Sequence, residues 1–251
     1  MSNVRHIEYA AASHKGLIRE QNQDNLWCDG VFLECKNDGL PNIITSRAGM
    51  DSCPVFALFD GLGGEVAGEH AAWLAARTFD DSASERFEKE GSDFLFNAFD
   101  LMNDSICGYA DSHHIGHMGT TAAALLFVDG VAIACNLGDS RVYLYRDRSL
   151  HCLSVDHVSN SIQAGKRCLT QYLGIRRDLF CIEPAMKKLD IDAQDCFLLC
   201  SDGLTDMLSE LEIEAVLARS EQPARVVKDL LEGALASGGA DNITIIVCTP
   251  V

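Results

Sequence analysis

Four aspartates in this sequence stand where an apolar run begins or ends, each next to a small or polar residue. Their contexts are Phe59-Asp60-Gly61, Gly138-Asp139-Ser140, Ser201-Asp202-Gly203 and Ala240-Asp241-Asn242. An Asp-Gly step alone usually marks no more than a turn. Four such positions in one chain indicate instead that carboxylates gather at the ends of several strands.

Gathered carboxylates favour a metal site. Several of them share a small volume only when cations or protons neutralise their charge. Oxygen ligands suit Mg²⁺ or Mn²⁺ better than zinc, which prefers nitrogen and sulfur. Two such ions about 3.5–4 Å apart can hold a bridging hydroxide and clamp the oxygens of an in-line displacement at phosphorus. The pattern therefore predicts hydrolysis of a phosphate ester.

The segments that must position these aspartates alternate between strand and helix patterns. Continuous apolar runs predict buried strands at 55–60, 120–128, 131–137, 141–145, 196–200 and 242–249. Apolar residues at helical spacing predict helices at 65–79, 93–109, 210–219 and 223–236. Asp129-Gly130 predicts a hairpin, because both turn residues tolerate positive φ. Hairpins with paired helices between them predict an α+β fold of antiparallel sheets with helices on their outer faces.

Composition narrows the partners and the compartment. Of the 251 residues 47% are hydrophobic, and no linker-like stretch interrupts them, so we expect one domain over residues 1–251. The 37 acidic and 20 basic residues give a formal net charge of −17, which disfavours nucleic acid and anionic membranes. The chain begins without an apolar signal segment, and its 11 cysteines include no Cys-x-x-Cys pair. We therefore expect a cytoplasmic protein with reduced thiols, most of them in the core.

Two other patterns could carry different chemistry. Cys135 and Arg141 have the Cys-x₅-Arg spacing of cysteine-dependent phosphatases. Cys135 lies inside an apolar run, however, where a thiolate of low pKa is not expected. His113, His114 and His117 could bind a transition metal, although a solvated loop is the simpler interpretation of this polar connection.

Six motifs, in order between about Tyr9 and Val247, resemble those of the PPM family, the type 2C metal-dependent protein phosphatases, and especially its bacterial members. The motifs lie at 16–24 (GLIREQNQD), 60–64 (DGLGG), 118–121 (MGTT), 136–141 (NLGDSR), 201–204 (SDGL) and 239–244 (GADNIT). Each motif alone is a weak signal. Their common order over nearly the whole chain makes the resemblance specific.

The resemblance implies a four-layer α-β-β-α sandwich of two antiparallel sheets flanked by helices. It implies hydrolysis of phosphoserine and phosphothreonine on proteins by a hydroxide that bridges two Mn²⁺ or Mg²⁺ ions, with a third ion in many bacterial relatives. The expected partners are a phosphorylated protein substrate and an opposing serine/threonine kinase. A monomer that binds neither nucleic acid nor membrane is expected.

The resemblance also implies a role for each residue that matches a motif. Asp60 is expected to bridge the two ions, with the carbonyl of Gly61 on one ion. Asp202 and Asp241 are expected on the other ion. Asp24 is expected to act on the ions through a metal-bound water.

The remaining implied roles concern the third ion and the substrate. Asp139, together with Asp202, is expected at the third ion. Arg19 is expected to hold the substrate phosphate, because a planar guanidinium can donate two parallel hydrogen bonds. Arg19 and Asp60 are thus the expected catalytic residues. Leu62 stands where animal relatives carry a histidine that protonates the leaving group, which leaves the general acid unassigned.

Two segments depart from the family pattern in length. Only about a dozen residues separate Asp156-His157 from 169–174, which predicts a shortened flap over the site. The segment from Asp29 to Cys53 is longer than the usual connection and is expected to be an inserted loop. These departures leave a second hypothesis, a pseudophosphatase that binds phosphorylated partners without turnover.

Overall fold

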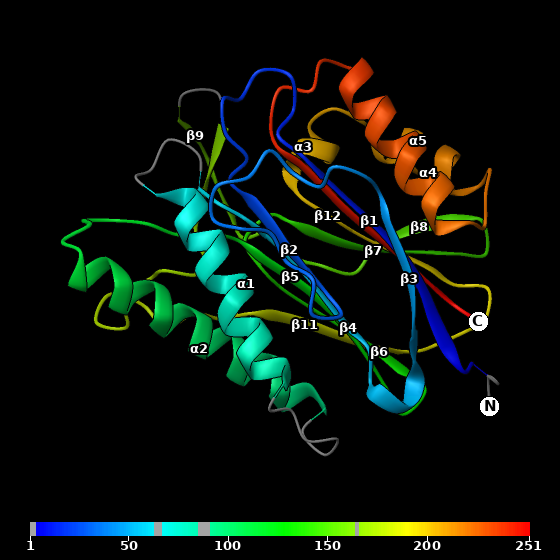
Figure 1. Cartoon of the computed structure of the whole chain (residues 1–251), viewed down its shortest axis with the longest axis horizontal. Helices are drawn as coiled ribbons and strands as arrows, with labels where there is room; N and C mark the ends of the chain where they lie inside the picture. The colour runs from blue at the N-terminus through cyan, green and yellow to red at the C-terminus, as the bar shows by residue number, and fades with distance from the viewer. Residues whose placement is uncertain (1–3, 63–66, 85–90, 164–165) are drawn as a thin grey trace.

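Two antiparallel β-sheets face each other in the computed structural model, which describes residues 4–62, 67–84, 91–163 and 166–251 (Figure 1). The six-stranded sheet has the order β3 (Ile44–Gly49), β1 (His6–His14), β13 (Ile243–Pro250), β12 (Cys196–Cys200), β7 (Arg141–Arg146) and β8 (Ser149–Cys152). The five-stranded sheet has the order β11 (Ala185–Asp190), β6 (Val131–Leu137), β5 (Ala122–Val128), β4 (Val55–Asp60) and β2 (Asp24–Cys28).

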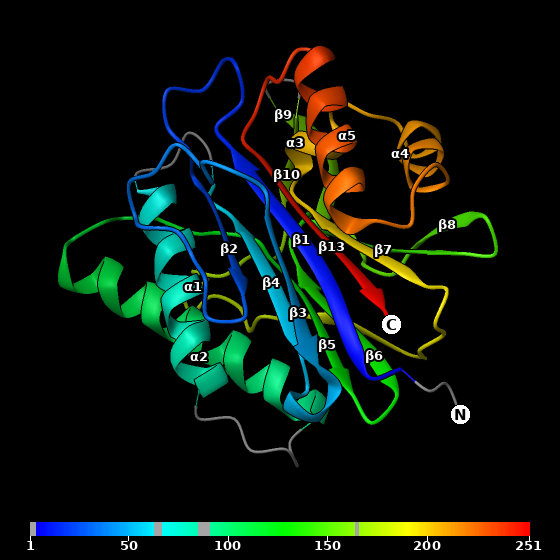
Figure 2. The same ribbon diagram turned by 45° about the vertical axis from the view of Figure 1, so that its right-hand side comes forward.

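Helices cover the outer face of each sheet (Figure 2). The helices α1 (Gly68–Ser84) and α2 (Gly91–Ser112) pack on the five-stranded sheet. On the six-stranded sheet lie α3 (Asp202–Thr205), α4 (Glu210–Leu217) and α5 (Pro223–Ala236). The 3₁₀ helix η1 (Met50–Ser52) precedes β4, and β9 (Val158–Gln163) pairs with β10 (Lys166–Leu169) as a separate hairpin. The predicted α+β sandwich of four layers is confirmed.

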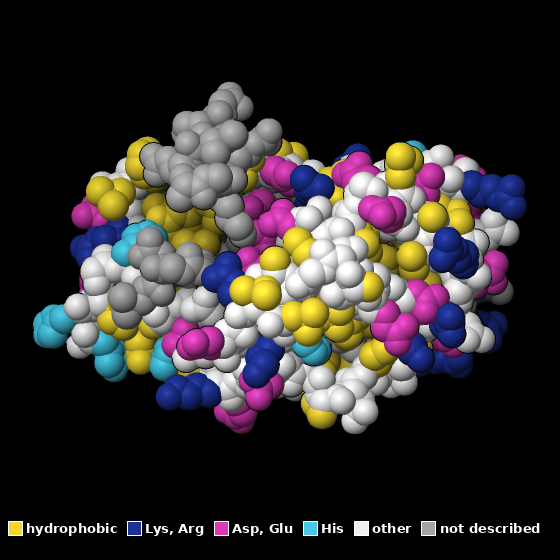
Figure 3. Space-filling model, turned by 90° about the horizontal axis from the view of Figure 1, so that it is seen from above, with side chains coloured by type: hydrophobic (Ala, Val, Ile, Leu, Met, Phe, Trp, Pro, Cys, Tyr) yellow, Lys and Arg dark blue, Asp and Glu magenta, His cyan; other side chains and the backbone are white. Residues whose placement is uncertain are grey.

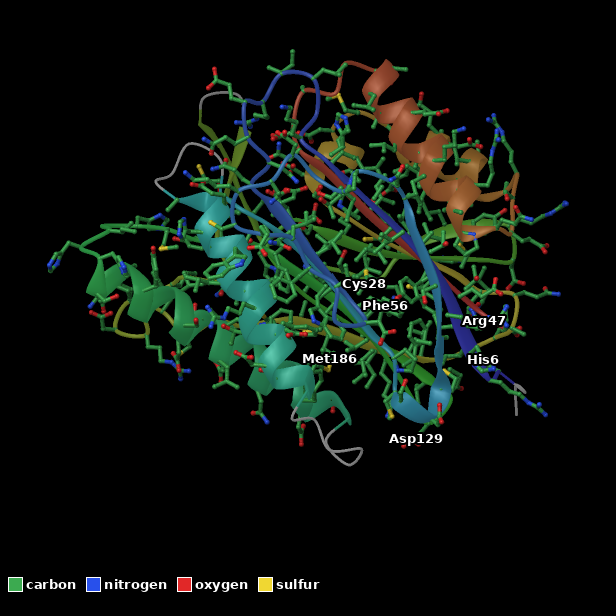
Figure 4. The ribbon with its side chains drawn as sticks, in the orientation of Figure 1. His6, Cys28, Arg47, Phe56, Asp129 and Met186 are labelled. Atoms are coloured by element: carbon green, nitrogen blue, oxygen red, sulfur yellow. The ribbon has the colours of Figure 1, made fainter. Side chains whose placement is uncertain are left out.

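The alternation of side chains along each strand divides the interior into separate cores. In β4, Ala57 and Phe59 point toward α1 and α2, whereas Phe56 and Leu58 point between the two sheets. Phe56 lies among aromatic rings there, with its centroid 4.8 Å from Tyr9 (Figure 4). A strand buried on both faces has no polar side, which explains the continuous apolar runs in the sequence.

Several predicted elements agree closely with the structure. The strands predicted at 55–60, 131–137 and 196–200 have these bounds in the structure. Asp129 and Gly130 form the predicted hairpin turn, with φ of 50° and 76°. The helix predicted from residue 65 begins at Gly68 in the structure, and residues 65 and 66 lie outside the described residues.

Two sequence predictions need correction. The segment expected to be an inserted loop contains β3, which pairs with β1 at the edge of the six-stranded sheet. Three of the six β3 residues are exposed, so this strand is held by backbone pairing and carries no apolar pattern. All 11 cysteines are free thiols, but only Cys28, Cys135, Cys200 and Cys248 are buried. The expectation that most of them lie in the core was wrong.

No helix in the described part of the chain is long and apolar enough to cross a membrane.

Candidate metal centre

Two of the predicted residues stand side by side in the five-stranded sheet. The antiparallel register of β2 and β4 pairs Asp24 directly with Asp60. Gly61 continues this edge, and its N–H donates to the carbonyl of Gln23 at 3.1 Å. A Cβ at Gly61 would lie 2.6 Å from that carbonyl oxygen, so only glycine fits this close approach.

The six-stranded sheet brings the other three aspartates to the same end. Asp202 follows β12 and Asp241 precedes β13, and these strands pair antiparallel. Asp139 precedes β7, in which Arg141 pairs with the last residue of β12. The strand ends that carry or adjoin these residues lie toward the upper end of the sandwich in Figure 1. The predicted metal residues therefore come together from both sheets.

Asp24 links the two sheets at this end. Its side chain is buried, and its Oδ2 accepts hydrogen bonds from Ser201 Oγ at 2.9 Å and Thr244 Oγ1 at 2.7 Å. Its Oδ1 is buried and has no hydrogen-bond partner among the described residues. Burial raises the pKa of Asp24 to about 7, although the two hydroxyls act in the opposite direction. An unsatisfied buried carboxylate oxygen is costly, and a cation nearby would satisfy it.

The whole cluster carries an excess of negative charge. Burial raises the pKa of Asp60 well above its usual value, and the charges of the four neighbouring aspartates raise it further. Burial and the charge of Asp202 raise the pKa of Asp139 to about 7. Hard divalent cations fit this set of oxygen donors. Within the described ranges, however, no three His, Cys, Asp or Glu side chains already stand in a coordination geometry.

Arg19 lies on the rim of the cluster. Its Nη2 donates to Asp241 Oδ2 at 2.7 Å, and this hydrogen bond raises the pKa of Arg19. The sequence prediction gave Arg19 to the substrate phosphate and Asp241 to a metal ion. The structure instead pairs the two side chains with each other. This contact uses one nitrogen of Arg19 and one oxygen of Asp241.

Asn242 fixes the turn that carries Arg19. Its Nδ2 donates to the carbonyl of Lys15 at 2.8 Å and to that of Gln21 at 2.9 Å. Its Oδ1 accepts from the N–H of Gln23 at 2.8 Å. The residue after Asp241 thus holds both ends of the Arg19 turn.

Reasoning from the sequence missed three residues with structural roles at the site, namely Ser201, Asn242 and Thr244. All three lie within the motifs at 201–204 and 239–244, which is the signal that could have identified them. Thr244 lies inside a strand pattern, and only the pairing of the sheets reveals its contact with Asp24.

Two hydroxyls and an ion pair hold the residues that directly follow Asp139. Thr121 Oγ1 accepts from the N–H of Asp60 at 3.2 Å and lies 2.6 Å from Ser140 Oγ. Arg141 donates two hydrogen bonds to Asp156, at 3.0 and 2.6 Å. The segment before β9 is therefore anchored to the strand that follows Asp139.

The alternative chemistries find little support in the structure. Cys135 is buried, and burial raises the pKa of its thiol to about 12, which removes the thiolate that nucleophilic attack requires. His113 lies 3.0 Å from the carbonyl oxygen of Tyr109, whereas His117 Nε2 lies 2.6 Å from the hydroxyl of Tyr172. The two histidines thus have different partners.

A separate hollow of about 1280 Å³ lies at the opposite ends of β7, β12 and β13. None of the predicted ligands lines it. Charges of both signs do, among them Glu8, Arg146, Asp195 and Arg219. The chemistry that the carboxylates indicate therefore belongs to the upper end of the sandwich.

Known proteins are similar to this chain in both sequence and fold. Residues 45–236 match the model of the protein phosphatase 2C family. The serine/threonine phosphatase stp of Listeria monocytogenes is 29% identical over 96% of this chain and 94% of that protein. The serine/threonine protein phosphatase PstP of Mycobacterium tuberculosis is 30% identical over 98% of this chain and 45% of that protein. A crystal structure of the PstP catalytic domain with two manganese ions has a TM-score of 0.78 at 27% identity, covering 98% of this chain and 99% of that chain. This chain belongs to the protein phosphatase 2C family.

Proposed function

We propose that this chain removes phosphate from phosphoserine and phosphothreonine in proteins at the carboxylate cluster described above. Its family and its named relatives make it a metal-dependent serine/threonine phosphatase. We propose in addition which residues hold the metal ions. Asp60, the Gly61 carbonyl, Asp202 and Asp241 would hold two Mn²⁺ or Mg²⁺ ions.

When bound, divalent ions polarise the phosphoryl oxygens and activate a water for attack at phosphorus. The chain's own residues orient the reaction. Arg19 would leave Asp241 and bind two phosphoryl oxygens with its guanidinium, while Asp24 accepts a proton or a hydrogen bond at its free Oδ1. Asp139 would add a third acidic group beside Asp202.

The observation that carries this proposal is the unpartnered Oδ1 of the buried Asp24. The other oxygen, Oδ2, already accepts hydrogen bonds from two hydroxyl groups, so the orientation of the carboxylate is fixed. The free oxygen belongs to a group whose neighbours are also acidic. A purely structural buried aspartate would be expected to have a hydrogen-bond partner at both oxygens. The comparisons lend no support to the pseudophosphatase hypothesis.

The test is release of phosphate from a phosphothreonine peptide with Mn²⁺, with and without excess chelator. Asp202→Asn is compared with Asp147→Asn, which lies in the β7–β8 turn at a φ of 52° that asparagine also tolerates. We expect turnover to need the metal and to fall at least about a hundredfold in Asp202→Asn only. Full activity of Asp202→Asn would overturn the residue assignment, and turnover that resists the chelator would overturn the metal mechanism.

Further details belong to the same proposal. The family and its relatives imply a phosphorylated protein as substrate. We infer that a serine/threonine kinase opposes this activity, that residues 1–251 form one catalytic domain, and that the chain acts as a monomer in the cytoplasm. A single species of the mass of one chain in analytical ultracentrifugation would agree with the monomer.

A further inference from the structure

Two large apolar side chains stand in solvent directly before Arg19. Leu17 is 62% exposed and Ile18 is 70% exposed. Exposed apolar side chains are common singly, but Leu17 and Ile18 are adjacent in sequence and directly precede an arginine of the site. Figure 3 looks down on this end of the sandwich and shows hydrophobic side chains next to a basic and several acidic ones.

The turn that presents them is held in place. The N–H of Leu17 donates to the carbonyl of Gly239 at 2.7 Å, and Asn242 fixes the residues on both sides. Gly16 has a φ of 80°, and a Cβ there would lie 2.7 Å from the same carbonyl oxygen. The turn therefore cannot rotate Leu17 and Ile18 into the core without breaking these contacts.

The apolar surface extends onto α5. A Cβ at Gly239 would lie 3.0 Å from Leu17 Cγ and 3.1 Å from Leu235 Cδ2, so both side chains border Gly239. We call the surface of Leu17, Ile18 and Leu235 the apolar strip.

The apolar strip lies next to Arg19, and this position indicates that a bound substrate peptide contacts it. A peptide whose phosphate lies at Arg19 advances about 3.3–3.6 Å per residue. The substrate residues next to the phosphorylated one therefore pass close to Ile18, which directly precedes Arg19. Apolar contacts are also independent of the net charge of −17, which would repel acidic substrates.

We propose that the apolar strip is a docking site for an apolar side chain close in sequence to the phosphorylated residue of the substrate. This inference rests on the proposed function, because it uses Arg19 as the phosphate-binding residue. It adds a substrate class, namely phosphoproteins with leucine-like residues flanking the phosphorylated position.

The experiment compares two phosphothreonine peptides that differ only in leucine or serine at the flanking positions, with Mn²⁺ present. We expect the wild type to prefer the leucine peptide about tenfold in kcat/KM, which corresponds to about 1.4 kcal/mol. The difference should lie mainly in KM. In the double variant Leu17→Ser, Ile18→Ser we expect the ratio of the two peptides to fall to about one. This ratio is internal to each variant, so a general loss of activity cancels.

Leu211→Ser is the matched control, because Leu211 is 78% exposed on α4 away from the strip. It should keep the tenfold ratio. A double variant that keeps the preference, or a wild type without one that still hydrolyses p-nitrophenyl phosphate, overturns the docking site alone. A wild-type dimer that the double variant dissociates, with no peptide preference, assigns the strip to a second copy and also overturns it. A wild type inactive on p-nitrophenyl phosphate overturns the proposed function and this inference together.

Discussion

Two buried aspartates at opposite ends of the molecule have opposite environments. Asp195 has a fully buried side chain, and Arg146 donates to both of its oxygens at 2.6 Å. The N–H of Asp192 adds a further hydrogen bond at 2.8 Å. Asp24 is equally buried, but its partners are two hydroxyls, and one oxygen has no partner within the described residues. One carboxylate is neutralised by the chain itself, whereas the other is left for something outside it.

The difference separates stability from function. A buried charge that has its partner is expensive to disturb, because removing one member leaves the other without compensation. A buried charge without a partner already destabilises the fold, and a ligand that binds it recovers that free energy. Substitutions at the Asp195 end of the six-stranded sheet are therefore expected to change the free energy of unfolding. Substitutions in the carboxylate cluster are expected to change metal binding.

The largest effect on stability is expected when Asp195 loses its cationic partner and so resembles Asp24. Arg146→Met leaves Asp195 buried and uncompensated, and we expect it to lower the free energy of unfolding by about 3–5 kcal/mol. Chemical denaturation with metal-free protein measures this loss. Turnover per folded molecule should stay at the wild-type level, since Arg146 lies at the far end. A stability loss below about 1 kcal/mol would mean that solvent already compensates Asp195.

A smaller effect is expected from occupying the cluster. Mn²⁺ at about a hundred times its dissociation constant should stabilise the folded protein by about 2.7 kcal/mol. For a chain of this length that corresponds to a rise in melting temperature of roughly 5–10 °C. Asp24→Asn should weaken metal affinity about 10–100-fold and, at the same Mn²⁺ concentration, lose from about half to most of the rise. Arg146→Met is the control and should show the full rise; equal rises in all three proteins would place the ion elsewhere.

The smallest expected effect is the pH dependence of the metal-free protein. The pKa of Asp24 is raised to about 7 in the folded state, above its value in the unfolded chain. The folded state therefore binds more protons between about pH 4 and pH 7, and its stability falls as the pH rises through this window. Between pH 6 and pH 7 we expect a loss of about 1 kcal/mol. Denaturation at both pH values measures it, and Asp24→Asn should reduce the loss; a rise in wild-type stability would contradict the prediction.

The sequence predicted strands best where a strand is buried on both faces. Residues 196–200 are apolar throughout, residues 131–137 are apolar except for Asn136, and both segments were assigned with their observed bounds. β3 was missed because an edge strand with exposed side chains has no such pattern. Its position depends on β1, which offers the backbone groups that it needs.

The candidate site was predicted as a set of residues but not as an arrangement. Strand ends and motifs sufficed to select the aspartates and Arg19. The donors to Asp24 are 177 and 220 residues away in sequence, so no local pattern could connect them. The pairing of Arg19 with Asp241 also could not be predicted from the sequence, because it depends on how the turn at 15–21 lies against Asn242.

The pairing of the first strand with the last one sets the order in which a newly made chain can become an enzyme. β1 lies between β3 and β13, and the contact of Ser13 with Thr244 spans 231 residues. Translation at about 5–20 residues per second separates these two residues by roughly 10–50 s. Throughout that interval one edge of β1 has no partner and Asp24 lacks its donor from β13. A ribosome-bound chain therefore holds an open strand edge that a chaperone can protect, and the surroundings of Asp24 are complete only after β13 has been synthesised.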